Sequence, residues 1–197
     1  MNMTYTLKRE ELGNGLLASI LEALAKAYKE IGAEVYVVGA AARDLSLKLL
    51  GAGSAPRRTM DLDVAVLLEK WDEYERLTEI LIKDGFVKAL EKQRFYYCGI
   101  ENVRYEVDIV PFGDIAQEEM VAWPPEGNPV MSVRCFADVM KNADKVSVED
   151  RFDFRMASLS GQWLIKLDAW CDRRLMTRKD AADMQFILEN AYITLAL

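Results

Sequence analysis

The stretch that decides the fold is Arg57-Arg58-Thr59-Met60-Asp61-Leu62-Asp63-Val64-Ala65-Val66, at residues 57–66. After Met60 the chain alternates acidic and apolar side chains and then becomes apolar, which is typical of a strand. On a strand, Asp61 and Asp63 point to one face with Cα atoms about 6.6–6.8 Å apart, and Leu62 points to the other. Two carboxylates about 4 Å apart repel by about 4 kcal/mol at an effective dielectric of about 20. A divalent cation with oxygen ligands would offset that repulsion.

A third carboxylate, Asp108, lies in another apolar run, Val107-Asp108-Ile109-Val110. An acid between Val and Ile is costly to bury without a partner. If the strand at 103–110 pairs beside the strand at 61–67, the three aspartates meet and can hold two Mg²⁺ ions about 3.5–4 Å apart. Taken alone, Asp-x-Asp is more often a solvated strand face or a turn, and that alternative stays open at this point.

Helical and strand patterns alternate around these acids. We expect helices at 10–31, 40–50, 70–83, 135–141, 160–176 and 179–195, and strands at 35–38, 61–67, 94–98, 103–110 and 145–149. Gly39 separates the first strand from a helix, so backbone N–H groups there would face a bound phosphate. The pattern predicts an α+β fold, with a mixed sheet and flanking helices at 1–155 and a helical region at 156–197.

The C-terminal helices carry one further expectation about packing. At 160–176 the residues Leu164, Leu167, Cys171 and Leu175 recur at helical spacing. Such a stripe predicts the helix face that packs against the core.

Composition excludes several classes of protein. The 197 residues carry a net charge of −7 and no histidine, which excludes Ser-His-Asp and Cys-His catalysis. The cysteines, Cys98, Cys135 and Cys171, are odd in number and far apart, so they suit a cytoplasmic protein rather than a disulfide framework. We find no apolar run near the roughly 20 residues that span a membrane. The acidic surface does not favour non-specific binding of nucleic acid.

The segment Gly39-Ala40-Ala41-Ala42-Arg43-Asp44, followed by Leu49-Leu50-Gly51 and then by Asp61-Leu62-Asp63, resembles a known signature. It is the signature of the DNA polymerase β nucleotidyltransferase superfamily, in the version of tRNA CCA-adding enzymes and poly(A) polymerases. Over about residues 35–190 the chain is similar to the AbiEii/AbiGii toxin-like nucleotidyltransferases. The supporting stretches are 58–63, 84–86, 107–113, 122–125, 166–173 and 178–183.

The resemblance implies a polymerase β-like fold and an enzyme that transfers a nucleoside monophosphate from an NTP to an acceptor hydroxyl, releasing pyrophosphate. Asp61 and Asp63 would bind Mg²⁺, and Asp108 would bind one metal and accept the proton of the hydroxyl. The residues implied in binding the nucleotide are Gly39, Ala40, Arg43, Thr59, Lys166 and Lys179. Members of the family usually have Gly or Ser where Ala40 stands, so a hydroxyl contact to phosphate is lost here.

Several roles stay open at this point. Lys166 and Lys179 either line the nucleotide cleft or form surface ion pairs between two helices. Arg43 either braces Asp61 or contacts the nucleotide. The segment Trp123-Pro124-Pro125 is more often a packed loop than a platform for a base.

The acceptor and the activity have alternatives too. The acceptor could be a small molecule such as an antibiotic, a protein, or a tRNA 3′ end. A toxin of a toxin–antitoxin pair would also have an antitoxin partner. Two rivals to an enzyme are a degenerate nucleotide-binding module, for which Ala40 is the main support, and a structural domain with solvated acids.

Overall fold

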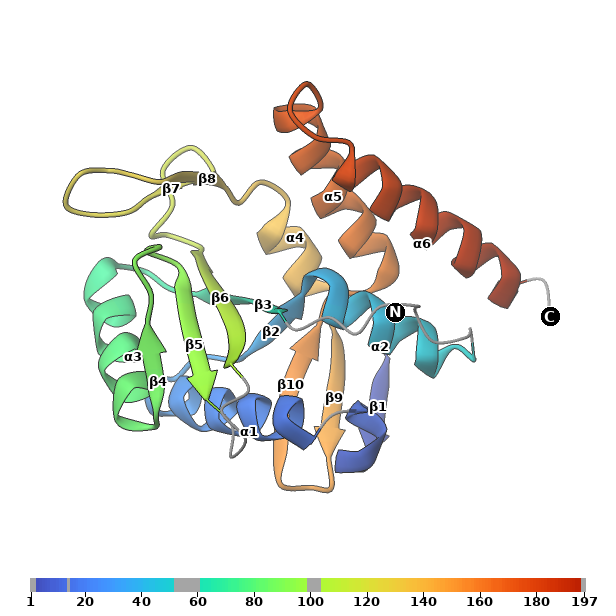
Figure 1. The fold of residues 1–197 in the computed structure, drawn as a ribbon, viewed down its shortest axis with the longest axis horizontal. Coiled ribbons are helices and arrows are strands. Elements are labelled where there is room, and N and C mark those ends of the chain that lie inside the picture. Colours follow the sequence, from blue (N-terminus) through green and yellow to red (C-terminus); the bar gives the residue numbers. More distant parts are fainter. Residues whose placement is uncertain (1–2, 14, 52–60, 99–103, 196–197) are drawn as a thin grey trace.

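The computed structural model describes residues 3–13, 15–51, 61–98 and 104–195 (Figure 1). The strands are β1 (Thr4–Leu7), β2 (Tyr36–Val38), β3 (Asp61–Leu67), β4 (Phe86–Lys88), β5 (Arg94–Cys98), β6 (Arg104–Phe112), β7 (Met120–Ala122), β8 (Val130–Ser132), β9 (Asp144–Val148) and β10 (Phe152–Met156). The helices are a 3-10 turn (Arg9–Leu12), α1 (Gly15–Glu30), α2 (Gly39–Leu49), α3 (Trp71–Lys83), α4 (Phe136–Lys141), α5 (Leu159–Arg173) and α6 (Lys179–Leu195).

An 8-stranded sheet organises the molecule, in the order β1-β9-β10-β2-β3-β6-β5-β4. The pairs β1–β9, β10–β2 and β3–β6 are parallel and the other neighbours are antiparallel. The sheet is therefore mixed, as the sequence predicts. β7 and β8 form a separate two-stranded ribbon beyond the end of β6 (Figure 1).

The two faces of the sheet carry different apolar clusters. On one face Leu62, Val64 and Val66 of β3 pack with α1 and α3 in the larger cluster. On the other face Ala65 packs with α4 and the segment around Trp123 in the smaller cluster. Side chains alternate along a strand, so the acids of β3 lie on the face of the smaller cluster.

The last two helices form a pair at one side of the sheet, where α5 contacts α2, α4 and α6 (Figure 1). The stripe predicted on α5 is wrong as a core face, because Leu164 is 44% exposed and Leu175 is 96% exposed. The buried residues of α5 are Gly161 and Gln162, in its first turn. The rest of α5 is partly or fully exposed, and besides the neighbouring helices it contacts β8, where Ser132 donates to Asp168.

Some predicted elements differ from those observed. The helix expected at 10–31 is divided, because Gly13 takes a left-handed φ of 78° and ends the 3-10 turn. The strands β1, β4, β7, β8 and β10 were not predicted, and each has 3 to 5 residues. Within the described ranges, no helix combines the length and the apolar character needed to cross a membrane.

Candidate active site

Strand pairing brings the acids of β3 and β6 together. The parallel register sets Asp63 directly opposite Asp108, and Asp61 opposite Glu106. The prediction that the strand of Asp108 pairs beside the strand of Asp61 and Asp63 is thus confirmed. In both strands these acids alternate with buried apolar residues, so they share one face of the sheet.

The turn from β2 into α2 lies against Asp63. Val38, the last residue of β2, is the register partner of Asp63, and Gly39 begins α2 with a φ of +65°. A Cβ at position 39 would lie 2.2 Å from Oδ2 of Asp63, far inside van der Waals contact. Only glycine accepts this conformation and this approach together. The first turn of α2, which includes Ala40, therefore starts directly beside the carboxylate.

Electrostatic crowding acts on Asp63. Burial and the nearby charges of Asp61 and Asp108 raise the pKa of Asp63 to about 6, against the usual 3.8. Lys166 and Lys179 oppose this rise. The carboxylate is therefore costly to ionise in the folded protein, and a cation beside it would stabilise the ionised form.

Arg94 contacts the third acid, and no pattern in the sequence predicted this contact. Arg94 on β5 is the register partner of Asp108 on β6. Its Nε donates to Oδ1 of Asp108 at 2.8 Å, and its Nη2 donates to Oδ2 at 2.9 Å. Its Nη1 lies 2.9 Å from Oε2 of Glu106. These contacts raise the pKa of Arg94 further above its usual value. Only the register of β5 against β6 could have revealed them.

The donor set suits a hard divalent cation, since carboxylate oxygens are the ligands that Mg²⁺ prefers. The crowding of acids at Asp63 is consistent with a cation site. In the part of the chain that the structure describes, however, no three acidic or thiol groups are arranged to enclose a metal ion. Asp108 has both oxygens engaged on the β5 side of its strand.

Two of the basic residues singled out in the sequence, Lys166 and Arg43, form ion pairs with acids. Lys166 lies 2.8 Å from Asp183 and 3.6 Å from Asp180, so the ion pairs between helices are present. Arg43 of α2 reaches α6, where it pairs with Asp183 at 3.1 Å and stacks on Phe186. The observed partners of Arg43 are Asp44 of α2 and Asp183 and Phe186 of α6, and Asp61 is not among them. Lys166 and Lys179 still act on Asp63 through their charge.

Two further predictions concern residues at the edge of this region. Thr59, with Arg57 and Arg58, lies outside the described residues. Trp123 is 2% exposed and packs on Trp71, with ring centroids 5.7 Å apart. Trp123 is accordingly packed in the core, as the more frequent alternative had it, whereas Pro124 and Pro125 are exposed.

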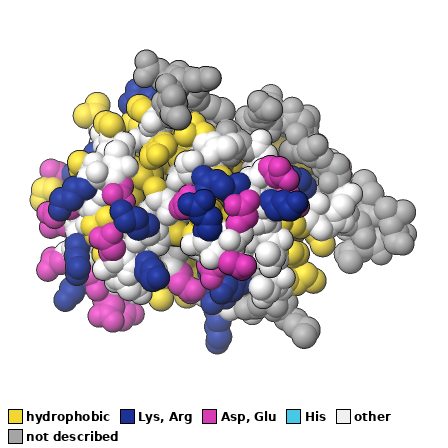
Figure 2. All heavy atoms as spheres, turned by 90° about the horizontal axis from the view of Figure 1, so that it is seen from below, with side chains coloured by type: hydrophobic (Ala, Val, Ile, Leu, Met, Phe, Trp, Pro, Cys, Tyr) yellow, Lys and Arg dark blue, Asp and Glu magenta, His cyan; other side chains and the backbone are white. Residues whose placement is uncertain are grey.

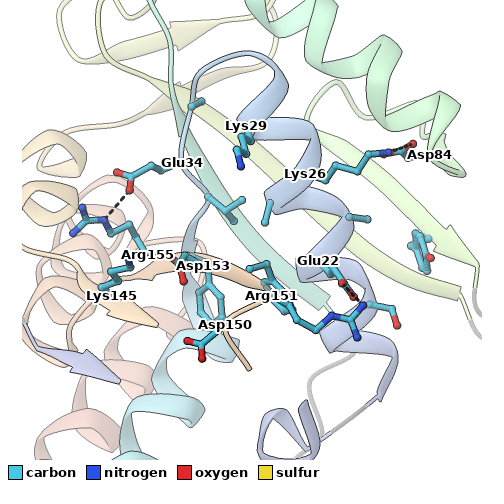
Figure 3. A pocket seen from close by; sticks show the side chains of 18 residues that line it. Glu22, Lys26, Lys29, Glu34, Asp84, Lys145, Asp150, Arg151, Asp153 and Arg155 are labelled. Atoms are coloured by element: carbon cyan, nitrogen blue, oxygen red, sulfur yellow. Dashed lines mark hydrogen bonds and ion pairs between the residues drawn. The ribbon is translucent and has the colours of Figure 1, made fainter. Parts of the chain in front are cut away.

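A second group of charges lines a groove beside α1 (Figure 3). Figure 2, seen from below, shows basic and acidic side chains interspersed rather than separated. The ten charged residues of the groove are Glu22, Lys26, Lys29, Glu34, Asp84, Lys145, Asp150, Arg151, Asp153 and Arg155. Ion pairs join Lys26 to Asp84, Lys145 to Asp153, Arg151 to Glu22 and Arg155 to Glu34. The groove is thus balanced in charge, unlike the cluster around Asp63.

Comparison with solved structures identifies the fold. A nucleotidyltransferase-like antigenic protein from Paracoccidioides brasiliensis is similar with a TM-score of 0.54 and 17% identity, over 95% of this chain and 78% of that chain. The antibiotic-resistance factor ANT(2'')-Ia is similar with a TM-score of 0.48 and 16% identity, over 92% of this chain and 90% of that chain. The Thermotoga maritima CCA-adding enzyme has a TM-score of 0.35 and 21% identity, over 52% of this chain and 23% of that chain.

These comparisons bear on the fold alone, and the first of them carries the conclusion. The molecule has the mixed α+β architecture of the nucleotidyltransferase fold, which confirms the predicted fold class. No protein-family model matches the sequence, and no curated protein matches it either.

Proposed function

We propose that the protein is a metal-dependent nucleotidyltransferase that transfers a nucleoside monophosphate from an NTP to an acceptor hydroxyl. One observation carries this proposal: Asp61 and Asp63 share a sheet face with Asp108, directly beside the glycine that opens α2. In this fold, that pairing gathers acids where a helix N-terminus can receive phosphates. The resemblance to AbiEii-type proteins in the sequence adds support for the same reaction class.

Each of the three aspartates has a proposed role in the reaction. Asp61 and Asp63 would hold Mg²⁺, and when bound the metal would offset the charge of the triphosphate and of the departing pyrophosphate. The acceptor oxygen attacks the α-phosphorus, the bond to the bridging oxygen breaks, and pyrophosphate leaves with the electron pair. Asp108 would take the proton of the acceptor hydroxyl. Catalysis would rest mainly on positioning and electrostatics.

Nucleotide contacts are proposed for the residues around this centre. The backbone at Gly39 and Ala40 would approach the phosphates, and Ala40 can offer no hydroxyl to them. Lys166 and Lys179 would contribute positive charge, which is consistent with their effect on the pKa of Asp63. Thr59 and Arg43 complete the set, although Arg43 would have to leave Asp183 in order to reach a nucleotide. We also propose that residues 1–155 form the catalytic domain and 156–197 a helical region beside it.

The experiment is an incubation of the protein with labelled NTPs, Mg²⁺ and separate pools of antibiotics, proteins and tRNA. We expect pyrophosphate release and label on one pool, and we expect Asp63→Asn to lower the rate by about 100-fold or more. An acceptor of tRNA or protein, together with growth arrest on expression, would support a toxin that has an antitoxin partner. Release that persists unchanged in Asp63→Asn would contradict the proposal.

A degenerate nucleotide-binding module is the second candidate. The observation that favours it is Arg94, which engages both oxygens of Asp108. Tight NTP binding without turnover on any acceptor would support this candidate. Calorimetry with each NTP, run beside the turnover assay, separates the two.

A further inference from the structure

Arg94 is fully engaged with acids. The Nε and Nη2 atoms of its guanidinium contact Asp108 and its Nη1 contacts Glu106, all within 2.9 Å. The side chain of Arg94 is 27% exposed, and those of Asp108 and Glu106 are 21% and 41% exposed. Bidentate pairs of this kind are stronger than single ion pairs and fix the plane of the carboxylate.

The position of Arg94 is set by backbone pairing. Asp63, Asp108 and Arg94 are consecutive register partners across β3, β6 and β5. Arg94 therefore holds Asp108 on the side away from Asp63. A carboxylate has about four lone-pair sites, and the fork occupies one on each oxygen. A divalent cation shared with Asp63 would meet a guanidinium of the same sign at the same acid.

We infer that Arg94 is a positioning residue. Its bidentate contact occupies the carboxylate of Asp108 until a divalent cation and nucleotide bind, and Glu106 then keeps its contact with the released guanidinium. The inference rests on the proposed function, because it takes the acids of β3 and β6 as metal ligands. It accounts for two observations together. Acids crowd around Asp63, and yet no three of them, within the described ranges, enclose a metal ion. Glu106 is already 2.9 Å from Nη1, so the guanidinium need not leave the site.

The test is the affinity for Mn²⁺ without nucleotide, measured by calorimetry and by the EPR signal of free Mn²⁺. In Arg94→Gln the competing fork is gone, and we expect Mn²⁺ to bind about tenfold more tightly. Arg94→Lys tests the bidentate contact separately from the positive charge, because lysine keeps the charge but cannot hold both oxygens of Asp108. We expect Arg94→Lys also to bind Mn²⁺ more tightly than the wild type, though less so than Arg94→Gln. Arg94→Lys also serves if the glutamine variant fails to fold.

Arg155→Gln is the matched control. Arg155 is 31% exposed and also pairs with a glutamate, Glu34, but it lies on β10, two strands away from β3 in the sheet order, in the groove of Figure 3. Its substitution should leave the affinity for Mn²⁺ unchanged. A tightening of similar size in Arg155→Gln would overturn the inference, because it would show a general effect of net charge.

Asp63→Asn distinguishes failure of the inference from failure of the proposed function. If Asp63→Asn abolishes Mn²⁺ binding while Arg94→Lys binds Mn²⁺ as the wild type does, the inference is overturned and the metal site stands. If Asp63→Asn binds Mn²⁺ like the wild type, the metal is not held at these acids and both fail. In the wild type, the Nε–H resonance of Arg94 should also move when Mg²⁺ and nucleotide are added, and no movement would overturn the inference.

Discussion

Two aspartates of this chain lie in opposite electrostatic surroundings. Asp180, at the start of α6, has a side chain that is 0% exposed, and Arg173 donates to its two oxygens at 2.6 and 2.7 Å. The hydrogen bonds from Arg173, together with the charge of Lys166, lower the pKa of Asp180. Asp63 has Asp61 and Asp108 as neighbours, and its pKa is raised to about 6. Asp180 has its countercharges in direct contact, whereas Asp63 forms no ion pair among the described residues and has only the more distant charges of Lys166 and Lys179.

The difference separates a structural acid from one that we propose to be functional. The charge of Asp180 joins α5 to α6 and is satisfied within the fold. The charge of Asp63 is left under repulsion, which is a common feature of sites that receive a cation or a ligand. The number of charges in a region is therefore less informative than their balance, as the groove beside α1 also shows.

The largest effect should come from Asp180→Asn. An asparagine cannot neutralise Arg173 and Lys166, so we expect the free energy of unfolding to fall by about 3 kcal/mol, the lower end for a broken buried pair. Arg173 is 49% exposed and can turn partly to solvent, which keeps the loss at that lower end. Urea unfolding near neutral pH measures it. Asp172→Asn, at an exposed acid of α5, is the control and should change stability by less than about 0.5 kcal/mol.

Substitution of Asp63 should change the free energy of unfolding in the opposite direction, towards greater stability. The folded pKa of about 6 lies above the usual 3.8, so the folded protein holds this proton more tightly than the unfolded chain does. The stability from protonated Asp63 is present below about pH 4 and is lost as the pH rises through about 6. At about pH 8, Asp63→Asn should therefore raise the free energy of unfolding by up to about 3 kcal/mol.

The same variant should lose activity, since the proposed metal ligand is gone. Urea unfolding of wild type and Asp63→Asn between about pH 4 and 8 follows the stability gain, which should grow from about pH 4 and level off above about pH 6. If Asp63→Asn is less stable than the wild type at about pH 8, the folded protein compensates the charge of Asp63. The contrast with Asp180 would then not hold.

The fold was predicted wherever the pattern is local and long enough. The alternation at 61–67 gives β3 with the bounds that the structure has, and the strands expected at 94–98 and 103–110 correspond to β5 and β6, which pair with each other. β10 was missed although Phe152-Asp153-Phe154-Arg155-Met156 alternates, because we expected a boundary between regions there. The stripe on α5 failed because periodicity identifies an apolar face and does not say whether a partner covers it.

The residues of the site were predictable only where they differ clearly from their neighbours in the sequence. Asp61, Asp63 and Asp108 stand out as acids in apolar runs, and Gly39 as the glycine that ends a strand. Arg94 does not stand out, because one arginine at the start of a strand gains meaning only through its cross-strand partner. The pairing of Arg43 with Asp183 spans 140 positions, and no local pattern encodes such a contact.

The smallest expected effect comes from substituting Lys166, which contacts one aspartate and acts on the other. Lys166 lies 3.6 Å from Asp180, and its charge lowers the pKa of Asp63. Lys166→Gln should therefore reduce the free energy of unfolding by about 0.5 kcal/mol and raise the titration midpoint of the Asp63 carboxyl still further above its usual value.

Lys179 is the matched control. It acts on Asp63 too, but among the described residues it shares no ion pair with Asp180. Lys179→Gln should move the Asp63 midpoint and leave the cost of Asp180→Asn unchanged, whereas Lys166→Gln should alter both. Carboxyl NMR titration follows the midpoint, and double-mutant unfolding gives the coupling. If both lysine variants couple equally to Asp180, the two acids belong to one network and the separation into structural and functional acids is wrong.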